Sequence, residues 1–427
     1  MYTPQFSDFD ASDYTYELPP EFIAARPAGK RTSGRLLTAW VHKHLVEHRS
    51  FHEIETLLPA GAMLVVNHTR VIAARLRMLK AGGGAAEVFL LRPVLPSPDP
   101  AVALATRNGC TWRCLLGGRR LLPGAVVQTE KNGIVLKAVV MQRNEGEAEV
   151  KLTWNDGAMS FAEILDAFGD TPLPPYIKRA ADEDDKQRYQ TVYAEQGGSV
   201  AAPTAGLHFS DELLRNLQDR GISLQRLTLH VGAGTFKPLA GPNPADHNMH
   251  AEQIVVEAET IAALAEHCAR RDRNGAAQSP IVPVGTTSVR TLESLYWFGV
   301  DLLAGRRPEK PTFYVGQWAP YEADGSCNPT TRPEQALNAV GDWLREQGLA
   351  RLEGETQLMI LPGYRFQLCD ALITNFHQPN SSLLLLVGAF LGRSFWRAVY
   401  ADALAHNYRF LSYGDGSLLF GPAFPSN

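Results

Sequence analysis

The spacing of apolar residues changes character along the chain. Between residues 71 and 153, short apolar runs follow one another closely, and Gly, Asn and Pro turns separate them without any stretch of helical length. Short strands at close, even spacing are typical of a small antiparallel barrel or sandwich. The runs that predict these strands are residues 86–91, 125–129, 134–140 and 148–152.

Outside this segment, apolar strands alternate with amphipathic helices, which predicts an α/β domain. The fold class is therefore an α/β main domain, residues 1–70 and 154–427, with an inserted all-β, barrel-like small domain, residues 71–153. Residues 298–355, rich in Gly, Pro and charge, are predicted to be an insertion within the main domain. The acidic run 182–185 predicts a solvated loop. Strands are expected at residues 61–66, 222–231, 281–284 and 372–375, and helices at 161–168, 210–217, 257–271, 334–347 and 396–405.

Length and composition are those of an ordinary globular protein. A chain of 427 residues exceeds the size at which one core keeps growing, which also favours two domains. The net charge of −4 provides no global basic field, so a polyanionic partner would need a local patch such as Lys178 with Arg179. The five cysteines are scattered, and no signal peptide or membrane-length apolar run is evident. We therefore expect a cytoplasmic protein without a membrane contact.

Candidate chemistry is concentrated between residues 197 and 254. Three blocks there contain His208, His230, His247 and His250, and the first two blocks also carry Pro203, Gly206, Gly232 and Gly234. Histidine has the side-chain pKa nearest neutrality and suits proton transfer, while glycine lets a ligand lie against the backbone. Each histidine would serve equally well as a hydrogen-bonded structural residue. His247 and His250, with Glu252 nearby, would also suit a metal, but no cysteine has ligand spacing, and we predict no metal site.

Polar residues also follow several predicted strands. A Gly-Thr-Thr-Ser turn at residues 285–288 leads into a helix that carries Arg290, and this turn offers free N–H groups and hydroxyls to a carboxylate or phosphate. Asn375 and His377 follow another strand, as does Arg70. Carboxyl ends of strands are well placed for function in open α/β sheets, although such residues would equally serve as caps.

These blocks, in their order along the chain, resemble the S-adenosylmethionine:tRNA ribosyltransferase-isomerase family of queuosine biosynthesis. The resemblance implies transfer of the ribosyl part of S-adenosylmethionine to tRNA that carries 7-aminomethyl-7-deazaguanine at the wobble position. The products would be epoxyqueuosine-tRNA, adenine and methionine, with S-adenosylmethionine as a consumed substrate, no cofactor and a monomeric enzyme. The matching segments are residues 173–179, 188–193, 202–209, 229–236, 246–252, 284–293, 362–366, 374–377 and 408–415.

Such chemistry needs a base for a proton beside the sulfonium, an acid for the departing adenine and a seat for the methionine carboxylate. The candidate catalytic residues are His208, His230, His250 and Glu252. Lys178 and Arg179 are candidates for tRNA binding. The candidate substrate-binding residues are Arg70, Thr204, Gly206, Phe209, Gly232, Gly234, Thr235, Phe236, Thr286, Thr287, Ser288, Arg290, Tyr364, Asn375 and His377.

Two features depart from the family pattern. His68 stands where the family has aspartate, and residues 298–355 extend the chain, with Trp318 and Tyr321 offering either base stacking on tRNA or a plain surface excursion. These departures keep two alternatives open: a paralogue of the same fold that acts on another base or RNA, and a catalytically silent RNA-binding protein.

Overall fold

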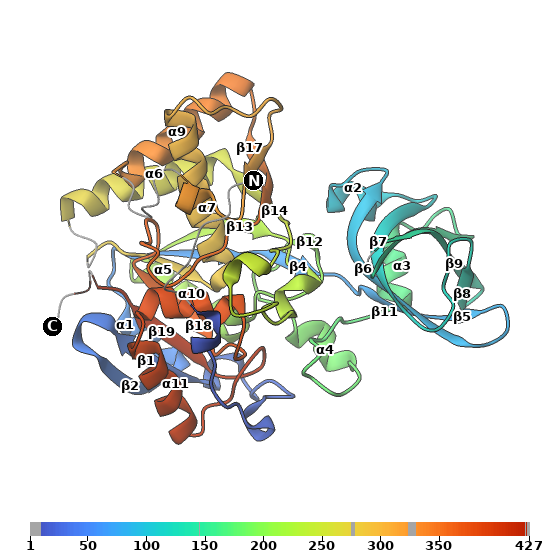
Figure 1. Ribbon diagram of the computed structural model, residues 1–427, viewed down its shortest axis with the longest axis horizontal. Coiled ribbons are helices and arrows are strands. Elements are labelled where there is room, and N and C mark those ends of the chain that lie inside the picture. Colours follow the sequence, from blue (N-terminus) through green and yellow to red (C-terminus); the bar gives the residue numbers. More distant parts are fainter. Residues whose placement is uncertain (1–9, 145, 275–277, 323–329, 423, 425–427) are drawn as a thin grey trace.

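The computed structural model describes residues 10–144, 146–274, 278–322, 330–422 and 424. Figure 1 shows a large α/β part and a separate small barrel joined by short connections. The predicted fold class is confirmed. The limits of the two domains at residues 70 and 154 stay a prediction.

A ten-stranded mixed sheet forms the centre of the large part. Its middle strands, β13, β3, β15 and β18, run parallel, and β3 and β15 are buried along their whole length, as expected for parallel strands covered on both faces. From edge to edge the strands are β16 (Phe313–Val315), β17 (Arg351–Thr356), β14 (Glu252–Glu257), β13 (Ser223–Leu229), β3 (Met63–Asn67), β15 (Ile281–Val284), β18 (Ala371–Asn375), β19 (Gly416–Phe420), β1 (Arg35–Trp40) and β2 (Leu45–Ser50).

The small part is a closed antiparallel barrel. Its strand order is β5-β6-β7-β10-β9-β8, and pairing of Leu79 with Gln128 joins β8 back to β5. Buried and exposed residues alternate along β10 and β7, so side chains such as Trp112 and Val150 fill the interior. The strands are β5 (Arg75–Lys80), β6 (Ala85–Leu95), β7 (Cys110–Gly117), β8 (Val126–Lys131), β9 (Ile134–Asn144) and β10 (Glu147–Trp154); β11 (Gly169–Asp170) pairs with β5, and β4 (Thr69–Val71) with β12 (Gln196–Ser199).

The predicted helices are confirmed with small shifts at their ends. Helix α3 begins after Ser160, whose hydroxyl accepts from the Glu163 N–H, and it packs Phe161 into the barrel core. The helices are α1 (Ile54–Leu57), α2 (Pro100–Ala105), α3 (Phe161–Phe168), α4 (Glu183–Arg188), α5 (Asp211–Asp219), α6 (Ala258–Asn274), α7 (Thr286–Leu303), α8 (Ala319–Glu322), α9 (Pro333–Gln347), α10 (Ser382–Leu391) and α11 (Phe395–Ala405).

The prediction of a solvated acidic loop at residues 182–185 is confirmed for the exposure of residues 182–184 but wrong about the loop and about Asp185. This run caps and begins α4, and the side chain of Asp185 is fully buried. Burial is tolerated because Arg179 donates two hydrogen bonds to the carboxylate, at 2.6 and 2.8 Å. The countercharge, Arg179, lies outside the acidic run, so the composition of the run alone suggested that all four acidic side chains face solvent.

Residues 298–355 are built into the main domain rather than displayed on its surface. Strand β16 extends the sheet beside β17, and α9 packs against α6 and α7. Tyr321 is 6% exposed and its hydroxyl hydrogen-bonds to the Met359 carbonyl, so the expected stacking of Tyr321 on tRNA is wrong. Residues 323–329 of this segment lie outside the described residues.

No single helix in the described ranges has the length and hydropathy needed to cross a bilayer. Helices α10 and α11 together pass that test only as a pair bent by 110°, and both contribute buried residues to the main core.

Candidate active site

A cleft of two joined chambers lies where loops follow the central parallel strands. The first, here called the threonine chamber, takes its wall from the segments after β12, β15 and β18. The second, the arginine chamber, lies beside it and shares Thr235 and Leu383 with it. Polar residues of the threonine chamber are Thr204, Thr235, Thr286, Thr287, Thr374, Asn375, His377, Gln378, Ser381 and Ser412; the arginine chamber is lined by Gly232, Gly234, Thr235, His247, Met249, His250, Glu252, Arg290, Leu358, Met359, Ile360, Ser382, Leu383 and Leu386.

A buried ion pair forms the floor of the arginine chamber. Arg290 donates through Nη1 to Glu252 Oε2 and through Nε to the Leu358 carbonyl at 3.1 Å. Glu252 Oε1 accepts from the Thr235 hydroxyl at 3.0 Å and from the Gly232 N–H at 3.4 Å. Within the described residues, the buried Nη2 of Arg290 has no acceptor. The chamber lining also includes Met249, Met359 and aliphatic side chains, so an unsatisfied guanidinium N–H of a lining residue is suited to an anionic group with an apolar chain.

Neutral polar groups furnish the threonine chamber. The Thr204 hydroxyl donates to Asn375 Oδ1 at 2.8 Å, and the Thr374 hydroxyl lies 2.9 Å from His377 Nε2. Burial lowers the pKa of His377 to about 4, so this ring is uncharged at neutral pH. Thr287 Oγ1 is buried and has no partner within the described part of the chain. Hydroxyl and amide groups of this kind suit the hydroxyls and base edge of a nucleoside.

Two half-exposed histidines flank the arginine chamber. His250 lies with Nε2 3.1 Å from Lys237 Nζ, and its ring packs against Gly234, where an added Cβ would come within 2.4 Å of the imidazole. Partial burial and the Lys237 ammonium lower the pKa of His250, and burial with His250 and Lys237 does the same for His247. Both imidazoles are therefore neutral near pH 7 and able to accept a proton.

The remaining two candidate histidines do not line either chamber. His208 stacks on Phe51 with ring centroids 4.7 Å apart, and burial lowers its pKa to about 4. His230 bonds through Nδ1 to the Thr69 hydroxyl at 3.0 Å, and burial again brings its pKa to about 4. Both rings are packed into the protein rather than presented to the cleft.

His68 lies next to His230 and also outside the two chambers. Its Nε2 is 3.1 Å from the Thr228 hydroxyl, and burial lowers its pKa. His68 is thus held by its contact with β13 and lines neither chamber.

Several other predicted site residues have packing roles. Phe209 and Ser288 are fully buried, and the Tyr364 hydroxyl donates to the buried Glu293 at 2.6 Å. Gly206 is required by packing, since an added Cβ would lie 2.0 Å from the Tyr193 hydroxyl. Arg70 and Lys178 are exposed outside the cleft, Arg179 pairs with Asp185, and the Phe236 side chain lies outside the described residues.

Gln317 holds the wall of the arginine chamber and was missed by the sequence analysis. Its Nε2 donates to the His247 carbonyl at 2.6 Å, and its Oε1 accepts from the Met249 N–H at 2.9 Å. Sequence gave no signal for it, because it lies in the segment 298–355, far along the chain from residues 247–250. Met249 stands inside a predicted block and was overlooked because apolar residues carry no chemical signature.

His247, His250 and Glu252, which the sequence suggested as possible metal ligands, do not form a metal site in the cleft. Glu252 is occupied by Arg290, and within the described ranges these three residues do not gather their ligand atoms as a metal would require. A group of three side chains that does so lies elsewhere on the molecule and is described below.

Nearly the whole chain is similar to known proteins of one family. The family described as "Queuosine biosynthesis protein" matches residues 11–419. A protein of Citrifermentans bemidjiense named S-adenosylmethionine:tRNA ribosyltransferase-isomerase is 36% identical over 416 residues, which cover 96% of this chain and 99% of the relative. A protein of Magnetococcus marinus with the same name is 38% identical, covering 96% of this chain and 93% of the relative. A crystal structure of S-adenosylmethionine tRNA ribosyltransferase from Thermotoga maritima matches at 28% identity with a TM-score of 0.44, covering 96% of this chain and 100% of that one.

Proposed function

This chain belongs to the queuosine biosynthesis protein family, and we propose that it transfers and isomerises the ribosyl moiety of S-adenosylmethionine onto 7-aminomethyl-7-deazaguanine at the tRNA wobble position. The products are epoxyqueuosine-tRNA, adenine and methionine. The observation that carries the proposal is the similarity of nearly the whole chain to relatives that bear the ribosyltransferase-isomerase name. S-adenosylmethionine serves as a consumed substrate, without a further cofactor, and the enzyme acts as a monomer in the cytoplasm.

In this proposal, the methionyl end of S-adenosylmethionine occupies the arginine chamber. The free Nη2 of Arg290 receives the carboxylate, and Met249, Met359 and Leu386 contact the aliphatic chain. Glu252 is a positioning residue that holds Arg290 through Nη1 and leaves Nη2 without a protein acceptor. The chamber thereby supplies one strong ionic contact beside apolar and a few polar side chains, the pattern typical of small-molecule sites.

The nucleoside end occupies the threonine chamber, where Thr204, Thr287 and Asn375 present hydroxyl and amide groups. Thr235 lies at the junction of the two chambers, so the sulfonium lies near it. His250 is the proposed base for the proton beside the sulfonium, because it lines the arginine chamber and is neutral near pH 7. The barrel approaches this region: Arg92 of β6 forms an ion pair of 3.9 Å with Glu355 of β17.

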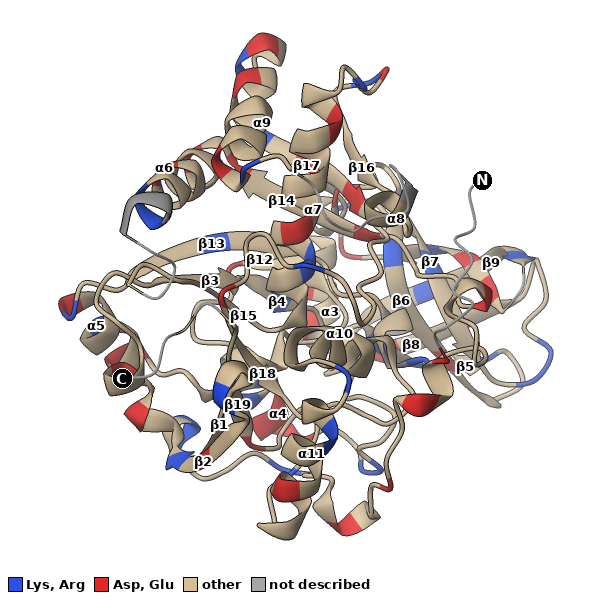
Figure 2. Ribbon diagram, turned by 60° about the vertical axis from the view of Figure 1, so that its left-hand side comes forward, with Lys and Arg blue, Asp and Glu red and all other residues tan. Residues whose placement is uncertain are grey.

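Among the described residues in the view of Figure 2, Lys and Arg are interspersed with Asp and Glu over the helices and strands, in keeping with the net charge of −4. The tRNA contact is therefore assigned to single side chains rather than to a broad basic face. Of the two basic candidates, only Lys178 presents an exposed ammonium, and we propose it as a phosphate contact. Arg179 is assigned to the fold, because its guanidinium is paired with Asp185.

The test is incubation of the purified chain with S-adenosylmethionine and tRNA bearing 7-aminomethyl-7-deazaguanine, followed by mass spectrometry of adenine, methionine and the modified nucleoside. Release of adenine in equal amount to the modified nucleoside is expected. Absence of adenine, while a family relative is active in the same mixture, would refute the function. This result would favour the paralogue or the silent RNA-binding protein. His68 was one reason to consider the paralogue, but its side chain lines neither chamber of the cleft.

Two variants test the proposed roles. Arg290→Lys keeps the charge but removes the second guanidinium N–H, so the KM for S-adenosylmethionine should rise about tenfold or more. His250→Ala should lower kcat, whereas His52→Ala, which changes an exposed histidine outside both chambers, should leave it unchanged. Full turnover by His250→Ala would remove His250 from the mechanism.

A further inference from the structure

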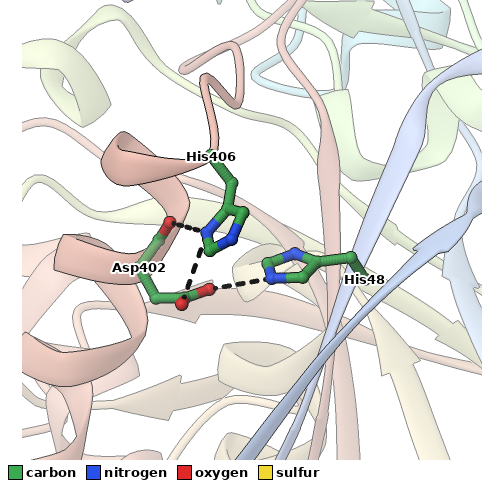
Figure 3. A group of neighbouring side chains, drawn as sticks. All are labelled: His48, Asp402 and His406. Carbon is green, nitrogen blue, oxygen red and sulfur yellow. Dashed lines mark hydrogen bonds and ion pairs between the residues drawn. The ribbon is translucent and has the colours of Figure 1, made fainter.

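Three side chains far apart in sequence gather at the outer edge of the main sheet (Figure 3). His48 lies on the edge strand β2, while Asp402 lies in the last turn of α11 and His406 directly follows that helix. His48 Nε2 is 3.2 Å from Asp402 Oδ2, and His406 Nδ1 is 3.4 Å from Asp402 Oδ1. One ligand atom from each residue lies within 4.8 Å of the other two.

A contact to the second ring nitrogen of His48 fixes the orientation of its imidazole. Its Nδ1 is 3.1 Å from the hydroxyl of the buried Tyr408, which is able to accept the Nδ1 proton and leave the Nε2 lone pair directed at Asp402. Metal-binding histidines commonly have a partner of this kind on the second ring nitrogen.

Asp402 carries an unsatisfied oxygen. Its Oδ2 is buried and accepts no hydrogen bond within the described residues, although His48 stands at ion-pair distance. A buried carboxylate oxygen without a donor is costly, and a cation placed between it and the two imidazoles removes that cost.

We propose that His48, Asp402 and His406 form a three-ligand site for a divalent transition-metal ion, with Zn²⁺ as the defining case and water as the fourth ligand. Metal–ligand bonds of about 2.0–2.1 Å in a tetrahedron place the ligand atoms about 3.3–3.4 Å apart. Each imidazole lies near this distance from one oxygen of Asp402, His48 Nε2 from Oδ2 at 3.2 Å and His406 Nδ1 from Oδ1 at 3.4 Å, so a small rotation of the carboxylate would bring one oxygen to both. Two imidazoles with one carboxylate favour zinc, cobalt or nickel over magnesium or calcium. This site departs from the sequence prediction of no metal.

Binding requires a defined tautomer of His406. Its Nδ1 lies 2.9 Å from the carbonyl of Asp402, so a metal at Nδ1 would place the proton of the neutral ring on Nε2. Arg35, which lies over the Tyr408 ring and bonds the His406 carbonyl, is a positive charge beside the site and opposes the metal.

The site would join the edge of the sheet to the segment that enters the cleft. His406 immediately precedes residues 407–415, which carry Leu411 and Ser412 to the wall of the threonine chamber. A metal bridging β2 and the end of α11 would fix the start of this segment, which is a structural role separate from the proposed reaction.

The experiment uses the full chain without a histidine tag, treated with EDTA and dialysed against Zn²⁺, with bound metal counted by mass spectrometry. One Zn²⁺ per chain is expected, and Co²⁺ should give the visible absorption of a low-coordinate site. His48→Gln, Asp402→Asn and His406→Gln should each weaken Zn²⁺ binding by about tenfold or more, whereas the matched variant His52→Gln should not. Zn²⁺ should also raise the Tm of the unmodified chain and of His52→Gln but not of His406→Gln.

Circular dichroism in EDTA establishes that each variant is folded before its affinity is compared. If His48→Gln or Asp402→Asn fails to fold, the exposed His406→Gln decides the question, since it removes one ligand from the end of a helix. Equal Zn²⁺ binding by His406→Gln and the unmodified chain would overturn the proposal and direct attention to His247 and His250. Absence of bound Zn²⁺ above the dialysis buffer would overturn it as well.

Discussion

Replacing Arg179 with alanine separates a structural role for this residue from a role in tRNA binding. The substitution removes two hydrogen bonds to the fully buried carboxylate of Asp185. Asp185 retains the Tyr413 hydroxyl at 2.7 Å and the Asp182 N–H at 2.9 Å but loses its countercharge. A buried charge left in this way is unfavourable, so the variant should be strongly destabilised.

The magnitude follows from the pKa of Asp185. Burial raises this pKa, but hydrogen bonds from Arg179, Asp182 and Tyr413 outweigh burial and lower it from 3.8 to about 2. A pKa lowered to this extent corresponds to roughly 2–3 kcal/mol in favour of the folded state at neutral pH. Breaking a buried ion pair by removing one partner typically costs about 3–5 kcal/mol, so Arg179→Ala should lower the free energy of unfolding by about 2–5 kcal/mol.

Urea unfolding at pH 7, followed by circular dichroism, measures this loss. Because the folded-state pKa is depressed, the contribution of Asp185 is present above about pH 4 and disappears as the pH falls towards 2, so the deficit of the variant should shrink in acid. Asp185→Asn should recover part of the lost stability in the Arg179→Ala background, and Lys178→Ala should have little effect because its side chain is exposed. Unchanged stability of Arg179→Ala, together with weakened tRNA binding, would refute the structural role.

Three further predictions concern the surroundings of the cleft. Burial raises the pKa of Glu293 to about 7, despite hydrogen bonds from Tyr364, Leu368 and Gln367 that lower it. The protonated carboxyl therefore favours the folded state below pH 4.5, and this contribution to the free energy of unfolding is lost as the pH rises through 7. In urea titrations, the free energy of unfolding of Glu293→Gln, relative to that of the unmodified chain, should therefore rise by about 3 kcal/mol between pH 4.5 and 8. A difference between the two free energies that stays constant with pH would contradict this. Gln317→Ala should raise the KM for S-adenosylmethionine about tenfold through loss of two hydrogen bonds, with the exposed Gln347→Ala as control, and equal KM values would exclude the support role. His68→Asp should change kcat/KM in the adenine-release assay by less than about threefold, and a loss above about tenfold would place His68 in contact with substrate.

The layout of the cleft follows from patterns that a sequence contains. Strands β15 and β18 are apolar runs with polar residues at or just after their carboxyl ends, and β13 lies parallel to them in the same sheet. Parallel strands bring their carboxyl ends to one edge of a sheet. Residues at or after these ends, among them Thr235, Thr287 and Asn375, were therefore predictable as neighbours, and they do line the cleft. Close spacing of short strands likewise predicted the barrel.

The direction of each side chain was not predictable in the same way. A histidine in the sequence does not show whether its ring faces a cleft, as for His250, or packs on an aromatic ring, as for His208. The pairing of Glu252 with Arg290, 38 residues further on, depends on where separate segments meet. Arg179 and Asp185 are only six residues apart, but the sequence does not show that Asp185 is buried and therefore needs this partner.

One helix sets the distance between the two chambers. Helix α7 presents Thr286 and Thr287 to the threonine chamber and Arg290, three residues further on, to the arginine chamber. Three residues of an α-helix advance about 4.5 Å, so the two contacts are held at a nearly fixed separation. On the same helix, Glu293 accepts from the N–H groups of Gln367 and Leu368, and Arg290 Nε bonds the Leu358 carbonyl. The segment of residues 358–368, part of which lines the arginine chamber, is therefore attached to the helix that lines both chambers. A ligand whose two ends bind the two chambers meets a preformed spacing, and the energy of binding is then available to orient the bond between its two halves.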